Sequence, residues 1–173
     1  MTETLKTLLG NQYEASLCTL NYCIERCPDE NWNARVANLK FCQAAFHALF
    51  YADFYLGQSP DDFKKQPFHR ENASFFADYE EFEDRAPVKM YERPAIEKYM
   101  QHCRTRANQI IVSESADSLA APCGFRHKTF SRAELHVYNI RHIQHHAAQL
   151  SLRLRLDANV DIPWVGSGWR AQA

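Results

Sequence analysis

The sequence HIQHHAAQL (residues 142–150) lies within a longer stretch, residues 131–157, whose apolar periodicity predicts one continuous helix. At about 100° of rotation per residue, His142 and His146 stand one turn apart on the same face, the spacing at which two imidazoles can bind one metal ion. His145 lies about 60° to the other side of His142, so this spacing also allows a His142/His145 pair. The stretch therefore predicts a metal site on a helix and leaves its second ligand open.

The surroundings of the pair argue against the simpler interpretation, which is a pair of exposed helix histidines. The stripe that holds His142 and His146 is shared by residues suited to an interface: Leu135, Tyr138, Gln149 and Leu152. The arginines of the same stretch lie mostly off it. We therefore expect both imidazoles to face inward, where they need partners.

Length and composition indicate one globular domain, residues 1–173, with a sizeable core, because 46% of the residues are hydrophobic and 24% are charged. The formal net charge is −1 and the basic residues are scattered, which argues against a nucleic-acid or anionic membrane partner. No apolar run has the length of a signal peptide or a membrane span. We therefore expect a cytoplasmic protein.

The six cysteines fit that expectation as reduced thiols. They form no CxxC pair, and several of them fall within helical patterns. We expect most of them to be small core residues.

Two helices are predicted in the first third of the chain. Apolar residues recur at three- and four-residue steps over residues 5–24, and Pro28 ends this pattern. A second helix is expected over residues 33–56, with Gly57 as its C-cap. The connection between the two is short, so we expect them to be antiparallel neighbours.

The remaining elements are separated by a long connection, residues 58–91, which is rich in proline, acidic and aromatic residues and has no clear period. Its aromatic content argues against a disordered linker, so we expect it to pack over the helices, with a short helix of its own. A third helix begins near Pro94 and fades after Glu114. After a loop over residues 115–130, the capping-box signature SRAE at residues 131–134 opens the fourth helix.

Four amphipathic helices without any strand pattern predict an all-α fold, a four-helix bundle with a long crossover between the second and third helices. Metal sites in such bundles are built from side chains on facing helices, so a third ligand should come from another helix. His47 is the histidine of the second helix, and its neighbours are apolar and aromatic. An inward imidazole there would be costly without a partner. The alternative is a core histidine bonded to a carbonyl group.

These residues resemble the DinB/YfiT-like metal-binding four-helix bundles. The resemblance covers nearly the whole chain: the break PDENW at residues 28–32, a histidine within the second helix, the long second connection, and HIQHHAAQL, which is similar to the family's HxxxH followed by two small residues, Gln and Leu. It implies that the metal ligands are His47, His142 and His146, with His145 as a neighbour. It also implies an up-down-down-up helix order and often a homodimer.

Three neutral imidazoles leave a divalent ion with open positions, as in catalytic sites. Imidazole suits several metals, and zinc or nickel is preferred here. The resemblance implies a thiol-dependent transferase in which the metal activates a low-molecular-weight thiol. The alternatives are a metal-dependent hydrolase and a non-catalytic metal-binding or stress-response protein.

The residues that would complete an active site are harder to predict. Arg141 and Gln149 are candidate contributors to a cosubstrate pocket. Asp53 lies about 120° around the second helix from His47, which argues against a role as general base. The sequence names no general base.

Overall fold

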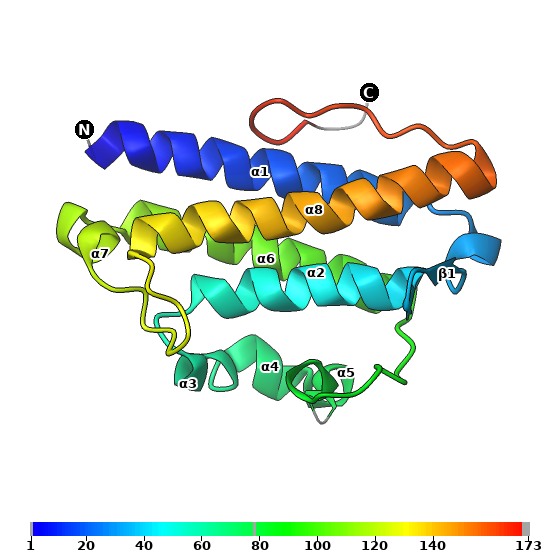
Figure 1. Cartoon of the computed structure of the whole chain (residues 1–173), viewed down its shortest axis with the longest axis horizontal. Coiled ribbons are helices and arrows are strands. Elements are labelled where there is room, and N and C mark those ends of the chain that lie inside the picture. The colour runs from blue at the N-terminus through cyan, green and yellow to red at the C-terminus, as the bar shows by residue number, and fades with distance from the viewer. Residues whose placement is uncertain (1, 78, 171–173) are drawn as a thin grey trace.

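The computed structural model describes residues 2–77 and 79–170. Most of these residues are helical, so the prediction of an all-α fold is confirmed. The long helices lie side by side (Figure 1), and they are α1 (Thr2–Arg26), α2 (Phe41–Leu56), α6 (Arg93–Ser113) and α8 (Arg132–Ala158). Within the described residues, none of the helices combines the length and apolar character that a bilayer crossing requires.

Each long helix packs against two others: α1 and α2 both contact α6 and α8. Among the described residues, α1 and α2 contact each other far less than either contacts α6 and α8, so the prediction that they are neighbours was wrong. The reason is the connection between them, which is longer than expected because α2 begins at Phe41 and not near residue 33. This connection holds a 3-10 turn, η1 (Asp29–Asn31), and an antiparallel hairpin of β1 (Arg35–Val36) and β2 (Leu39–Lys40). It is long enough to carry the chain across the end of the helices.

The long connection lies against α2, as predicted (Figure 1). Its described residues form three short helices and a 3-10 turn: α3 (Pro60–Phe63), α4 (Pro67–Glu71), α5 (Ala73–Phe76) and η2 (Glu80–Phe82). Its aromatic side chains reach the core, where Phe63 and Phe76 are buried and Phe46 of α2 stacks on Tyr91 with ring centroids 4.0 Å apart. Another short helix, α7 (Ala116–Ala120), interrupts the predicted loop before α8.

A buried carboxylate joins this connection to the helices. Asp53 of α2 is fully buried and accepts hydrogen bonds from Nε2 of His69 at 2.8 Å, the hydroxyl of Tyr99 at 3.0 Å and Nε2 of Gln66 at 3.2 Å. Burial alone would raise the pKa of Asp53, but the hydrogen bonds from His102 and His69 outweigh it and hold that pKa well below its usual range. Asp53 is therefore an ionised structural group.

A second buried network closes the C-terminal end of α2, just beyond Asp53. Arg132, at the start of α8, donates through Nε to Glu114 at 2.8 Å and through its other nitrogens to the carbonyl groups of Tyr55, Leu56 and Gly57 at 2.7–3.0 Å. These carbonyls are among the last of α2, which a helix leaves without partners of its own. Gly57 is the C-cap, as predicted, but its φ of −65° is not left-handed. The arginine thus supplies the donors that a left-handed glycine cap would have provided.

All six cysteines are buried and none forms a disulfide, as expected for core residues. Burial raises the pKa of Cys23 and of Cys27 to about 12. These thiols therefore stay protonated at neutral pH.

Acid is expected to remove the stabilisation that Glu114 provides. Burial raises its pKa, but hydrogen bonds from His136, Ser118 and Arg132 outweigh that effect and lower the value from 4.5 to about 2. A carboxylate whose pKa is lower in the folded state stabilises the fold above the unfolded pKa, and that contribution is lost as the pH falls towards the folded pKa. Burial also lowers the pKa of His136, whose neutral form donates a hydrogen bond to Glu114. Below pH 6.5 the unfolded chain therefore binds a proton at this histidine more readily than the folded protein does, which also lowers the stability in acid.

The measurement is urea denaturation of the wild type and Glu114→Gln between pH 7 and pH 3. The wild type should be the more stable protein at pH 7, and the difference in free energy of unfolding should persist down to about pH 4.5 and then shrink towards pH 3. A difference that stays constant across this range would show that Glu114 is not held ionised by its neighbours.

Candidate metal centre

The helix α2 is buried on almost all sides, and its open strip consists of His47, Tyr51 and Phe54. These residues are spaced three and four apart, so they lie on one face. His47 therefore stands at the edge of the core, with 26% of its side chain exposed, and not inside it as the sequence suggested. An imidazole in this position can be reached from solvent.

The histidines of α8 occupy a similar border. The buried face of this helix runs along Leu135, Asn139, Ile143, Ala147, Leu150 and Leu154. His142 and His146 are half-buried beside this face, whereas Gln149 is exposed and Leu152 is 56% exposed. The buried face of α8 is thus displaced by about one residue from the stripe predicted for His142 and His146. Because α8 packs against both α1 and α2, its apolar surface is broad and its centre is hard to locate from periodicity.

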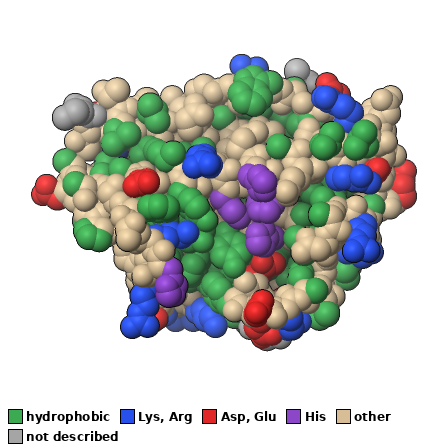
Figure 2. Space-filling model, viewed as in Figure 1, with side chains coloured by type: hydrophobic (Ala, Val, Ile, Leu, Met, Phe, Trp, Pro, Cys, Tyr) green, Lys and Arg blue, Asp and Glu red, His purple; other side chains and the backbone are tan. Residues whose placement is uncertain are grey.

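The structure brings His47 of α2 together with His142 and His146 of α8. One ring nitrogen from each of the three lies within 4.8 Å of the others. The ring centroids are 4.7 Å apart for His47 and His146, 5.5 Å for His47 and His142, and 4.6 Å for the pair on α8. Figure 2 shows histidine side chains gathered near the middle of this face, next to a hydrophobic area. We call these three residues the histidine cluster.

Electrostatics keeps the two imidazoles of α8 neutral. Burial, together with the proximity of His146 and His47, lowers the pKa of His142 to about 3. Burial and the proximity of His47 lower the pKa of His146 to about 4. At neutral pH these rings therefore keep a lone pair available for a metal ion.

One polar atom of the cluster lacks a partner. Nδ1 of His142 is buried, and among the described residues nothing donates a hydrogen bond to it or accepts one from it. Buried polar atoms are normally paired, so an atom without a partner beside two further imidazoles fits a cation. The donor set also fits, because neutral imidazole is a common ligand of divalent transition metals.

His145 is placed outside the cluster. It is exposed, and Nε2 of its ring accepts a hydrogen bond from Nε2 of Gln149 at 3.0 Å. The same Gln149 accepts through Oε1 from Nδ1 of His146 at 3.0 Å. The structure thus places the i,i+4 pair, and not the i,i+3 pair, beside His47, and it makes Gln149 a bridge between two histidines. Arg141 is exposed.

A family model described as the DinB superfamily matches residues 12–150, a range that includes all three histidines of the cluster. The chain belongs to the DinB superfamily. Comparisons with curated proteins and with solved structures found no match. The resemblance drawn from the sequence motifs is therefore confirmed at the level of the family.

One residue beside the histidine cluster of this DinB-superfamily protein could not be predicted from the sequence. Oε2 of Glu81, in the turn η2, lies 2.6 Å from Nδ1 of His47, and only 6% of the Glu81 side chain is exposed. The hydroxyl of Tyr51 donates to the carbonyl oxygen of the same residue at 2.8 Å. Glu81 belongs to an acidic run in a segment without periodicity, and nothing in the sequence distinguishes it from its acidic neighbours.

A pocket of about 310 Å³ opens beside the cluster of this DinB-superfamily protein. It lies between α2, α8 and the connection, and its lining includes His47, His146, Tyr51, Glu81 and Arg85. Its size suits a small molecule or part of a larger one. Asp53 is absent from its lining and fully buried.

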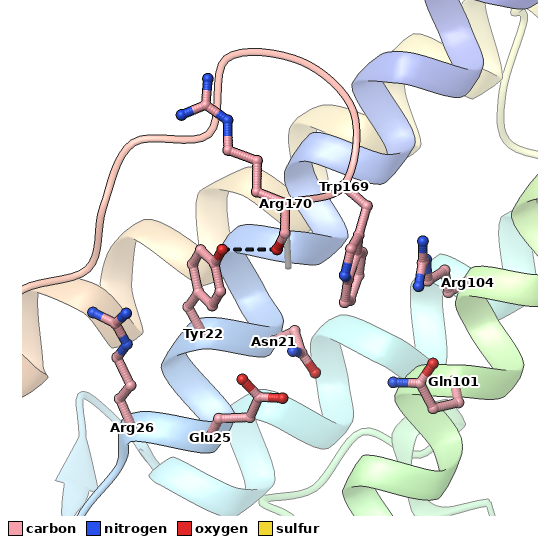
Figure 3. Close-up of a pocket in the computed structure, with 8 residues that line it drawn as sticks. All are labelled: Asn21, Tyr22, Glu25, Arg26, Gln101, Arg104, Trp169 and Arg170. Atoms are coloured by element: carbon pink, nitrogen blue, oxygen red, sulfur yellow. Dashed lines mark hydrogen bonds between the residues drawn. The ribbon is translucent and has the colours of Figure 1, made fainter. Parts of the chain in front are cut away.

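A larger pocket, about 580 Å³, lies elsewhere in the DinB-superfamily fold, between α1, α6 and the C-terminal tail (Figure 3). None of its lining residues is a histidine or a cysteine. Its Arg104 stacks 3.8 Å above the Trp169 ring and forms an ion pair with Glu14 at 2.8 Å, and Tyr22 donates to the carbonyl group of Arg170. These contacts fasten the tail to the helices, so we do not assign chemistry to this pocket.

Proposed function

We propose that the histidine cluster binds one divalent metal ion, zinc or nickel, and that the protein is a metal-dependent thiol transferase acting on a small molecule. The observation that supports this most directly is the convergence of three imidazole nitrogens from two helices within 4.8 Å of one another. A divalent ion held by three neutral imidazoles keeps open positions and lowers the pKa of a thiol that reaches it.

The residues around the cluster support this assignment in three ways. The low pKa values of His142 and His146 mean that no proton has to be removed from these rings before they bind a cation at neutral pH. The pocket beside His47 and His146 gives a small thiol and its electrophilic partner a place to meet. In the proposed reaction the thiol loses its proton to solvent, its sulfur forms a bond to the electrophilic carbon, and the leaving group departs with the electrons of the broken bond.

The site is proposed to lie on a four-helix bundle of up-down-down-up order. The packing of α1 and α2 on both α6 and α8 supports this arrangement. In Figure 1, the colour gradient runs from left to right along α1 and α8 and from right to left along α2 and α6. The homodimer that the family resemblance implies remains part of this proposal.

Metal binding is expected to depend on His142 and His146 and not on His145. The His142→Ala and His146→Ala variants should each lose most of the metal measured by elemental analysis after purification and dialysis, because two imidazoles form a weak, exchangeable site. The His145→Ala variant is the matched control, since it removes an imidazole from the same helix outside the cluster, and its metal content should equal that of the wild type. Equal losses from all three variants would contradict the assignment.

Activity is tested by incubating the purified protein with a panel of low-molecular-weight thiols and electrophiles, with and without chelator. Thiol consumption that chelator abolishes and added metal restores would support the transferase. A protein that holds metal in full occupancy and turns over no thiol would overturn the transferase proposal and favour a metal-binding protein without enzymatic activity.

A further inference from the structure

The turn η2 (Glu80–Phe82) contacts the open strip of α2 through the ring of Phe82, whose centroid lies 5.1 Å from that of Phe54, and through Glu81. The side chain of Glu81 contacts Nδ1 of His47 at 2.6 Å, and its carbonyl oxygen accepts from the hydroxyl of Tyr51 at 2.8 Å. His47 and Tyr51 are one turn apart on α2, so the two contacts fix both the position and the orientation of the carboxylate. A residue held in this way is placed to orient the imidazole beside it.

The neighbouring residues Glu80 and Glu83 make contacts within their own segment. Glu80 is buried and accepts hydrogen bonds from the backbone nitrogen of Val88 at 3.1 Å, the backbone nitrogen of Lys89 at 3.0 Å and the guanidinium group of Arg85 at 2.9 Å. Glu80 thus joins the turn η2 to the residues that follow it in the chain. Glu83 pairs with the same arginine. Glu81 is therefore the member of this acidic run whose carboxylate contacts the histidine cluster.

The contact decides which nitrogen of His47 is available. A neutral imidazole carries its proton on one nitrogen and a lone pair on the other, and the hydrogen bond made by one nitrogen selects the role of the other. The carboxylate beside Nδ1 favours the proton there and leaves the lone pair on Nε2, the remaining nitrogen for the cluster. An ionised carboxylate also makes the ring a stronger electron donor.

We propose that Glu81 is a positioning residue of the metal site: its carboxylate sets the tautomer and ring orientation of His47, and it thereby couples metal affinity to the docking of the connection on α2. The inference rests on the proposed metal site. It adds a carboxylate from an irregular segment to a site whose ligands all lie on long helices.

The test compares Glu81→Gln and Glu81→Ala with Asp84→Asn. The control removes one negative charge from an exposed position three residues along the same segment. Zinc affinity is measured by competition with a chromogenic chelator. Loss of a carboxylate behind a ligand histidine typically lowers metal affinity by about 10- to 100-fold, so we expect about 10-fold for Glu81→Gln, more for Glu81→Ala, and no change for Asp84→Asn.

A second measurement separates positioning from a general effect on folding and does not depend on metal. In the metal-free protein with ¹⁵N-labelled histidine, two-bond ¹H–¹⁵N correlations report which nitrogen of His47 carries the proton. The wild type and Asp84→Asn should show the Nδ1-protonated form, and Glu81→Ala should show a mixture of both tautomers.

The outcomes distinguish this inference from the proposed function. If the wild type binds zinc and Glu81→Ala binds it equally well with an unchanged tautomer, the positioning role is overturned and the metal site stands. If the wild type binds no zinc, the proposed function is overturned, whereas a tautomer shift in Glu81→Ala would still support the orienting role of the carboxylate.

Discussion

Zinc is expected to raise the melting temperature of the metal-free wild-type protein, and His47→Ala is expected to remove most of that rise. A ligand that binds only the folded state stabilises it by about 4 kcal/mol when present at a thousandfold excess over its Kd. For a chain of this size, that corresponds to about 8 to 16 °C. Because His47 lies on α2 and the other two imidazoles lie on α8, the bound ion would join the two helices. The measurement is differential scanning calorimetry with and without zinc.

The comparison depends on the metal-free proteins having similar stability. His47 is partly exposed, so its replacement by alanine should cost little when no metal is present. His145→Ala is again the matched control and should keep the full zinc-dependent rise. A His47→Ala protein that gains as much from zinc as the wild type would return His47 to the role of a structural histidine bonded to Glu81.

Replacing Arg132 by methionine is expected to destabilise the protein by about 3 to 5 kcal/mol, the usual cost of removing one partner of a buried ion pair. The side chains of Arg132 and Glu114 are each 2% exposed. Methionine matches much of the volume of arginine but donates no hydrogen bond. It would therefore leave the carboxylate of Glu114 without its cationic partner and the last carbonyls of α2 without their donor. Chemical denaturation at pH 7 measures the loss.

Two further variants show where that cost arises. Arg153→Met removes an arginine of α8 that pairs with Asp157 near the surface, and it should change the free energy of unfolding by less than about 1 kcal/mol. The double variant Arg132→Met/Glu114→Gln removes the stranded charge and should recover part of the loss. A cost below about 1 kcal/mol for Arg132→Met would show that neither the ion pair nor the helix cap contributes much.

The features predicted best from the sequence are the helices, because their apolar residues recur at regular intervals. The apolar periods located α1, α6 and α8, and Ser131 forms the predicted N-cap of α8 by accepting from the backbone nitrogen of Glu134. The start of α2 was placed too early because residues 33–40 include Val36 and Leu39, which continue a helical spacing. In the structure these two residues instead pair with each other across a short hairpin.

The part of the candidate site that was predicted from the sequence consists of residues that share one helix or belong to the family motif. The cluster of His47, His142 and His146 forms as the resemblance implied, although the binding of metal to it remains a prediction. The role of Glu81 could not be predicted, because its contact with His47 spans 34 residues of irregular chain. The network around Asp53 is of the same kind, since its donors come from α4, α6 and the connection between helices.

The near-complete burial of α2 limits how this protein can change its chemistry. Substitutions at most positions of the helix would alter core packing, whereas His47, Tyr51 and Phe54 are its partly exposed residues. Tyr51 lines the pocket, and Phe54 lies further along the same open strip. A library that randomises position 51 while keeping the three histidines would therefore sample new substrate preferences at the pocket wall, and it would also remove the Tyr51 contact that holds Glu81. Random mutagenesis of the whole helix would yield mainly unfolded variants.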